Sequence, residues 1–137
     1  MLFYDDTEHP LVRITIVGLR TPEDNTAYME RVDALLNAGE RFALLVDDRS
    51  TGTRSVQSAR ALRWAVTRWA QLKRSCVGMA VILDELDLER RDRAPRVPQP
   101  LTPVPVSVFG DAGMADTWVR SRLAAAAGRE VLKEYVR

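Results

Sequence analysis

Hydrophobic residues along the chain gather into four short runs, separated by longer segments in which polar and apolar positions mix. The runs are rich in β-branched and aliphatic side chains and cover residues 11–17, 42–46, 77–83 and 106–109. Short apolar runs bounded by polar or turn residues are typical of buried strands. A shorter run at 2–4 is expected to form a strand that pairs with 11–17 across the polar link between them.

The segment after the first long run has the pattern of an amphipathic helix. The sequence T-P-E-D at 21–24 favours a helix start, because threonine caps free amides and proline suits the first turn. The two carboxylates also favour the positive end of the helix dipole. Apolar residues then recur at helical spacing from 28 to 36, and Gly39 is a typical stop. A helix is therefore predicted between 21 and 39.

A second, long helix is predicted over residues 55–74. Three- and four-residue steps predict that one apolar stripe faces the sheet, formed by Val56, Ala59, Leu62, Val66 and Trp69. A second stripe is broader than one sheet face requires and consists of Ala61, Trp64, Ala65 and Leu72. We interpret the second stripe as packing on the C-terminal helix, with another subunit or a hydrophobic ligand as the alternatives.

The C-terminal third begins with a charged stretch and a proline-rich one. Residues 84–93 are highly charged, with a helix as one interpretation, and 95–105 hold five prolines, which predicts an extended surface loop. A helix is expected to start at Asp111, and Gly128 is interpreted as a break before a last amphipathic turn. The apolar positions of that helix are Met114, Ala115, Trp118, Val119 and Leu123.

Strands that alternate with helices indicate the fold class. The pattern predicts an α/β domain with a four- to five-stranded, mostly parallel sheet, an antiparallel N-terminal strand and helices packed on it. At 137 residues the chain is near the commonest size for one domain. A single domain over 1–137 is therefore expected.

Charge balance, hydrophobic run length and cysteine content argue against several classes of function. The 20 Lys and Arg nearly balance the 19 Asp and Glu, which argues against a nucleic-acid partner, because such binding needs a cationic excess. Every apolar run is far shorter than the ~20 residues that cross a bilayer, so no membrane span is predicted. The single cysteine, Cys76, excludes an internal disulfide and fits a reducing, cytoplasmic compartment. The chain lacks a glycine-rich phosphate loop and a G-x-S-x-G turn, and no cofactor is expected.

Four sequence pieces resemble a known family in their order and spacing. They are I-V-G-L-R-T-P-E at 16–23, F-A-L-L-V-D at 42–47, C-V-G-M-A-V-I at 76–82 and V-F-G-D-A-G-M-A-D-T-W at 108–118. Together they resemble the STAS fold of sporulation anti-sigma-factor antagonists, and more closely the small bacterial SpoIIAA-like proteins. The resemblance implies a non-catalytic regulatory domain that docks onto protein partners. The family's phosphorylated serine lies in a D-S-S-G-L-G run, whereas residues 47–55 read D-D-R-S-T-G-T-R-S, so no phosphoserine is assigned.

The polar segment 47–55 is the best candidate for a binding site. It is expected to be a loop that follows a buried strand and opens a helix, where α/β sheets present ligand sites. Its hydroxyls, its arginines and the helix amides could hold an anion, and the alternative is that these are ordinary turn and capping residues. The predicted binding residues are Asp47, Asp48, Arg49, Ser50, Thr51, Thr53, Arg54 and Ser55, with Trp64 on the helix that follows.

Protein docking is the leading functional hypothesis, and two other classes stay open. The SpoIIAA-like fold also resembles part of the CRAL-TRIO lipid-binding proteins, which implies a small apolar-ligand carrier as the first alternative. The second is a small enzyme that uses Asp47 or Asp48. Asp47, Asp48 and Asp84 could also gather at neighbouring strand ends and bind a divalent cation, with helix capping or solvation as the alternative. The only histidine, His9, excludes a His-pair zinc site and is expected on an exposed loop, and Cys76 is expected to pack in the core. A small anionic ligand and a homodimer also stay open.

Overall fold

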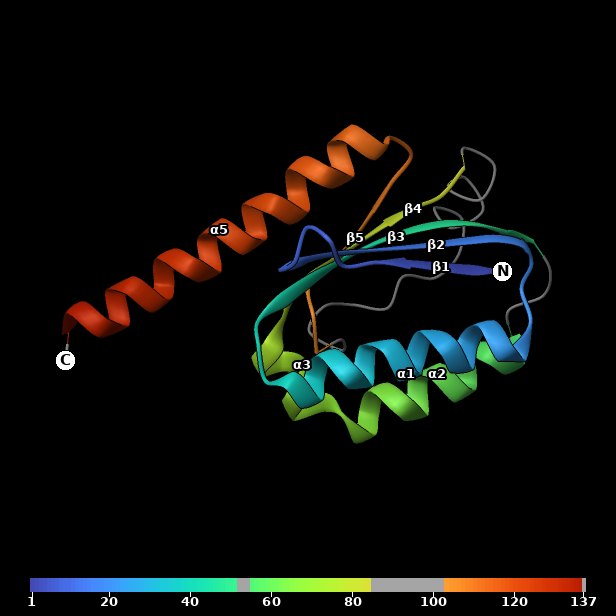
Figure 1. Ribbon diagram of the computed structural model, residues 1–137, viewed down its shortest axis with the longest axis horizontal. Helices are drawn as coiled ribbons and strands as arrows, with labels where there is room; N and C mark the ends of the chain where they lie inside the picture. Colours follow the sequence, from blue (N-terminus) through green and yellow to red (C-terminus); the bar gives the residue numbers. More distant parts are fainter. Residues whose placement is uncertain (52–54, 85–102, 137) are drawn as a thin grey trace.

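The computed structural model describes residues 1–51, 55–84 and 103–136, and within these ranges the side chains of 55–59 and 134–136 are not described. Its centre is one mixed sheet of five strands in the order β1-β2-β3-β4-β5 (Figure 1). Only β1 is antiparallel to its neighbour, and the other strands are parallel. This confirms the predicted α/β class and sheet. The strands are β1 (Leu2–Asp5), β2 (Leu11–Leu19), β3 (Phe42–Thr51), β4 (Cys76–Ile82) and β5 (Val106–Phe109).

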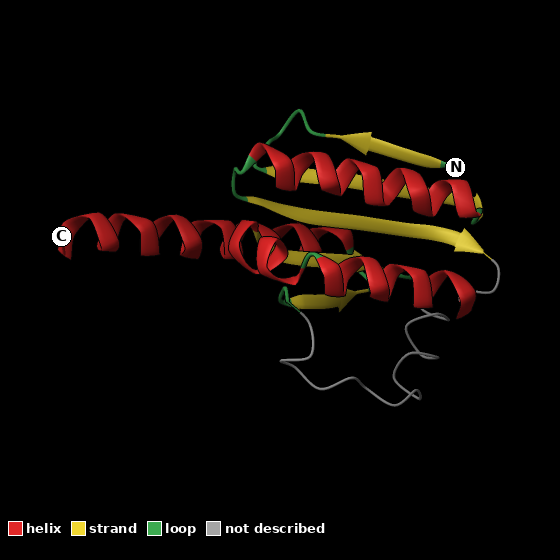
Figure 2. Ribbon diagram, turned by 90° about the horizontal axis from the view of Figure 1, so that it is seen from below, coloured by secondary structure: helices red, strands yellow, loops and turns green. Residues whose placement is uncertain are grey.

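Helices cover both faces of the sheet. On one face lie α1 (Pro22–Ala38), α2 (Ser55–Thr67) and α3 (Trp69–Ser75), and on the other lies α5 (Ala112–Val136). Figures 1 and 2 show that α5 runs across the sheet and continues well past its edge. None of the helices in the described part of the chain is long and apolar enough to cross a membrane.

Helix α1 has the ends that its sequence predicts. The Thr21 hydroxyl accepts a hydrogen bond from the Asp24 amide at 3.1 Å, and the Asp24 carboxylate accepts one from the Thr21 amide at 3.1 Å. This capping box satisfies two backbone donors that the first turn leaves open. At the other end Gly39 has φ of 73°, the left-handed conformation that favours glycine.

The core has two layers because successive residues of a strand point to opposite faces. On β2, Val12, Ile14 and Ile16 point toward α1 and α2, where the larger apolar cluster lies. Leu11 points toward α5, where the smaller cluster includes Ala115 and Val119, both fully buried. The larger cluster comprises Val12, Ile14, Ile16, Val32, Leu35, Leu36, Phe42, Leu44, Val46, Leu72, Cys76 and Val104.

The predicted inner face of the second helix is wrong at Leu62, Val66 and Trp69, while the side chains of Val56 and Ala59 lie outside the described residues. The helix is divided at Arg68 into α2 and α3, and Leu62 and Val66 are 64% and 58% exposed. Trp64 and Leu72, from the second stripe, pack against the large cluster instead. Trp64, Ala65 and Leu72 of that stripe therefore cover the sheet beside α1 and do not pack on the C-terminal helix, while Ala61 is exposed.

Two further predictions for the C-terminal third are wrong. Helix α5 passes through Gly128 without a break, since one glycine costs a helix only about 1 kcal/mol relative to alanine. The last part of the proline-rich stretch is not a surface loop, because Val104 is buried and the Pro105 carbonyl accepts a hydrogen bond from the Met79 amide at 2.9 Å. The predictions for 85–93 and 95–102 lie outside the described residues.

Candidate functional site

The segment predicted as a binding loop is largely strand. Residues Asp47 to Thr51 continue β3 and pair with Thr15 to Leu19 of β2. The sequence suggested a loop because the side chains turn polar at Asp47, but the backbone of every one of these residues has a ladder partner. Ser55 is the first residue of α2, and Thr53 and Arg54 lie outside the described residues.

Strand alternation separates the predicted site residues onto two faces of the sheet. Asp48 and Ser50 are buried on the α1 side, whereas Asp47, Arg49 and Thr51 point to the opposite side. Asp47 and Arg49 pair with each other there at 2.9 Å. The structure therefore does not bring the described members of this set together into one anion site.

The buried Asp48 belongs to a hydrogen-bond network that joins the end of β3 to α1. Its carboxylate accepts hydrogen bonds from the Ser50 amide at 3.0 Å and from the Ser50 hydroxyl. Arg20 donates to Asp48 at 3.3 Å and to the Asn25 side-chain oxygen at 2.8 Å. Because buried carboxylates need such partners, the contacts of Asp48 are those of a structural residue.

The described residues do not form the cluster of acidic side chains that the divalent-cation hypothesis requires. Asp47 and Asp48 are neighbours on a strand and thus point to opposite faces. Among residues 1–51, 55–84 and 103–136, no three acidic, histidine or cysteine side chains gather where they could hold a metal ion.

Trp64 lies beside a small apolar cavity between the sheet and the helices of the α1 face. The cavity holds about 160 Å³, and its lining includes Tyr28, Trp64, Leu72 and Met79. The Tyr28 and Trp64 rings meet edge to face with centroids 6.5 Å apart, and burial raises the pKa of Tyr28. Sites for drug-sized ligands hold roughly 300–1,000 Å³, whereas a cavity near 150 Å³ holds a molecule of benzene size. This cavity is too small for a lipid chain.

Cys76 is buried between the cavity and a second depression, as the core prediction requires. Burial raises the pKa of its thiol to about 12, and the thiol lies 3.6 Å from the Gly78 carbonyl oxygen. The thiolate is the nucleophilic form of cysteine, so this environment disfavours nucleophilic chemistry.

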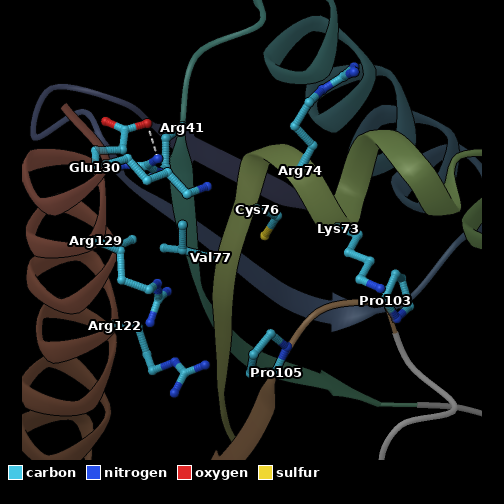
Figure 3. Close-up of a pocket in the computed structure, with 12 residues that line it drawn as sticks. Arg41, Lys73, Arg74, Cys76, Val77, Pro103, Pro105, Arg122, Arg129 and Glu130 are labelled. Carbon is cyan, nitrogen blue, oxygen red and sulfur yellow. Dashed lines mark hydrogen bonds and ion pairs between the residues drawn. The ribbon is translucent and has the colours of Figure 1, made fainter. Parts of the chain in front are cut away.

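A larger depression lies where β3, β4 and β5 begin, at the sheet edge opposite to the predicted site (Figure 3). It holds about 590 Å³ and opens between α5, α3 and the chain before β5. Six cationic side chains and one carboxylate are among its lining residues. We call it the basic hollow; it is lined by Arg41, Lys73, Arg74, Cys76, Val77, Pro103, Pro105, Arg122, Ala126, Arg129, Glu130 and Lys133.

Most cations of the basic hollow have no acidic partner among the described residues. Arg41 forms an ion pair with Glu130, the one carboxylate among the described lining residues. Within the described part of the chain no carboxylate pairs with the other five cations, which are Lys73, Arg74, Arg122, Arg129 and Lys133. In Figure 3, Arg122 and Arg129 extend from α5 toward β4, while Arg74 extends away from them.

Strand β4 contains a β-bulge, and Arg122 lies against the strand at this point. Phe42 and Leu44 of β3 pair with Cys76 and Met79, so β4 has one extra residue at this point. Gly78 faces α5, and a Cβ there would lie 3.2 Å from Arg122 Cγ. The Arg122 guanidinium also lies over the Trp118 ring, 5.8 Å from its centroid. The missing side chain at Gly78 thus allows the stem of Arg122 to lie close to β4.

Sequence reasoning missed the basic hollow because its residues come from four separate segments and the whole chain is nearly neutral. One signal could have indicated part of it. Arg41 and the Lys73-Arg74 pair stand just before β3 and β4, and the starts of parallel strands meet at one sheet edge. The cations of α5 carried no comparable signal, because the predicted break at Gly128 divided them.

Comparisons with known proteins identify no similar family, protein or structure. A scan against protein-family models gives no match, and searches of curated proteins and of solved structures give none either.

Proposed function

We propose that the chain is a non-catalytic, STAS-like regulatory domain of the SpoIIAA-like kind, which docks a protein partner on the outer face of α2 and α3. The observation that carries the proposal is an apolar stripe on this surface. Leu62 and Val66 are one turn apart on α2, Trp69 is the first residue of α3, and the three side chains are 64%, 58% and 36% exposed. We call these three side chains the docking face. Exposed apolar side chains grouped in this way are typical of interaction surfaces.

The charge around the docking face indicates the chemistry of the partner. Residues 55–75 contain five Arg and Lys and no Asp or Glu. Arg60 and Arg63 of α2 are exposed. Because interfaces match potentials of opposite sign, the proposed partner presents apolar side chains surrounded by acidic ones.

A second copy of this chain is a poorer occupant of the docking face. A two-fold dimer places the same patch against itself, so the cations around the stripe would face their own copies. Like charges at an interface cost binding energy. The proposal is therefore a heterologous protein with an acidic surface.

Local geometry supports binding over the two alternatives. A lipid carrier needs more room than the 160 Å³ cavity beside Trp64 provides. An enzyme that uses Asp47 or Asp48 needs a carboxylate available to a substrate, whereas Asp47 pairs with Arg49 and the buried Asp48 carboxylate accepts hydrogen bonds from Ser50 and Arg20.

The proposal is tested by capture of partners with a docking-face variant and a matched control. Leu62→Gln/Val66→Gln changes the stripe, and Met114→Gln changes a residue of α5 that is 64% exposed. Because both variants alter solvent-exposed positions, both should fold like the wild type. A captured protein is then purified and mixed with the wild type, and its footprint on the chain is mapped by amide hydrogen exchange.

We expect the purified partner to protect amides of α2 and α3, and the docking-face variant to bind at least about tenfold more weakly, since apolar contacts dominate interface cores. The Met114→Gln control should bind like the wild type. Equal binding to the wild type and the docking-face variant, or a footprint confined to α5, would contradict the proposal.

A further inference from the structure

The basic hollow carries a local excess of positive charge, although the chain as a whole is nearly neutral. Its lining has six cations and one carboxylate, whereas the whole chain has a net charge of only +1. In a recess with apolar walls such charges reinforce one another, because low-dielectric surroundings focus the field. The hollow is therefore the place in the described structure where the observations most favour a bound anion.

Helix dipoles account for some of these cations. Lys73 and Arg74 lie in the last turn of α3, and Lys133 lies in the last turn of α5. Cations at these positions stabilise the negative ends of helices without any ligand. Arg122 and Arg129 lie before the last turn of α5, Arg129 by one turn, and the dipole effect is largely confined to the last turn, so it does not explain them.

The geometry of Arg122 and Arg129 suits a ligand between α5 and β4. They are seven residues apart in α5, which places them on the same side of the helix, two turns apart. Both extend toward β4 in Figure 3, and Gly78 allows Arg122 to lie close to that strand. Two guanidinium groups two turns apart on one helix side match a ligand with more than one anionic group, since each binds a phosphate through two parallel hydrogen bonds.

The size and floor of the hollow limit the ligand to a small organic molecule. About 590 Å³ lies within the range of small-molecule sites. The floor is apolar where Val77, Pro103 and Pro105 contribute, which suits the carbon skeleton of such a molecule. A nucleic acid would need a longer cationic track than this recess provides.

We propose that the basic hollow binds a small organic molecule that carries at least two phosphate groups, held chiefly by Arg122 and Arg129. This function goes beyond partner docking, because the hollow and the docking face share no residue. A ligand here would contact α5 and α3 together and so link two elements that pack on opposite faces of the sheet.

The proposal is tested by calorimetric titration with tripolyphosphate, which carries the phosphate chemistry without a carbon skeleton. The wild type is compared with Arg122→Gln/Arg129→Gln and with Arg122→Lys/Arg129→Lys. The glutamine pair removes both charges, while the lysine pair keeps the charges and loses the paired hydrogen bonds. Arg31→Gln/Arg120→Gln is the matched control, because it removes two charges from exposed positions outside the hollow. Thermal melting checks that every variant is folded.

We expect tripolyphosphate to bind the wild type at least about tenfold more tightly than inorganic phosphate does. Each lost arginine should weaken binding about tenfold, since each removes a charge-assisted contact. The glutamine pair should thus lose about a hundredfold, and the lysine pair should lie between it and the wild type.

Three results would overturn the proposal. They are the absence of tripolyphosphate binding to the wild type, equal losses in the glutamine pair and the matched control, and binding of an octaglutamate peptide in place of tripolyphosphate. The last result would make the hollow a second protein-docking surface. A negative result in this titration leaves the docking-face experiment unaffected, because that experiment changes Leu62, Val66 and Met114, none of which lines the hollow.

Discussion

At the scale of single residues, Asp33 explains why the second helix turns its unexpected face inward. The Asp33 carboxylate, on α1, accepts a hydrogen bond from the Trp64 indole at 3.2 Å. Arg68 donates to the same carboxylate through two nitrogens, one of them at 3.0 Å. These bonds fix the rotation of α2 about its axis. Hydrophobic spacing alone does not distinguish two apolar stripes, so this polar contact decides which of them is buried.

Asp116 joins α5 to the N-terminal part of the sheet and makes stability depend on pH. Its carboxylate accepts hydrogen bonds at 2.6 Å from Arg120 and at 2.6 Å from Arg13 of β2. These bonds, that from Arg120 first, lower the pKa of Asp116. A carboxyl whose pKa is lowered by folding stabilises the fold above its unfolded pKa, about 3.9, and loses that contribution as the pH falls through the folded pKa.

We therefore predict that Asp116→Asn lowers the free energy of unfolding at pH 7 by only about 0.5–1 kcal/mol, because solvent screens this partly exposed network. The gap from the wild type should begin to narrow near the unfolded pKa, about 3.9, and close as the pH falls through the lower pKa of the folded carboxyl. Urea denaturation at a series of pH values measures it. Asp6→Asn is the control, since this exposed carboxylate has no ion-pair partner in the described structure. A gap that stays constant down to pH 2 would contradict the assignment.

At the scale of elements, α5 is the part that sequence reasoning divided wrongly. Gly128 is compatible with a helix, and a Cβ there would meet nothing within 4 Å. Asp111 caps the start of the helix by accepting a hydrogen bond from the Met114 amide at 2.9 Å. The continuous helix places Arg122 and Arg129 on one rigid body, as the basic hollow requires.

We predict that Gly128→Ala increases helical content and raises stability by up to about 1 kcal/mol, because alanine restricts the unfolded chain and favours a helix. Gly39→Ala should do the opposite and cost about 1–2 kcal/mol, since Gly39 has φ of 73°. Circular dichroism and thermal melting of the two variants measure both effects. A loss of helix in Gly128→Ala would mean that α5 breaks at that residue.

At the scale of the whole molecule, local pattern predicted the sheet but not the surfaces. The strands could be predicted because each is rich in apolar residues and ends at polar or turn residues, and α1 because both of its ends carry capping residues. The extension of β3 to Thr51 could not be predicted, because residues 47–51 are polar and lack the apolar run that indicates a strand, although they pair with β2. The basic hollow was missed because only the parallel sheet brings its four segments together.

The docking proposal depends on one arrangement: Trp64 points inward and Trp69 outward. The most direct measurement is quenching of tryptophan fluorescence by acrylamide in the wild type, Trp64→Phe and Trp69→Phe. We predict that Trp69→Phe removes a readily quenched component, while Trp64→Phe removes a protected one, since Trp64 packs against the core and Trp69 is exposed. The reverse assignment would place Leu62, Val66 and Trp69 against the sheet and would contradict the docking face.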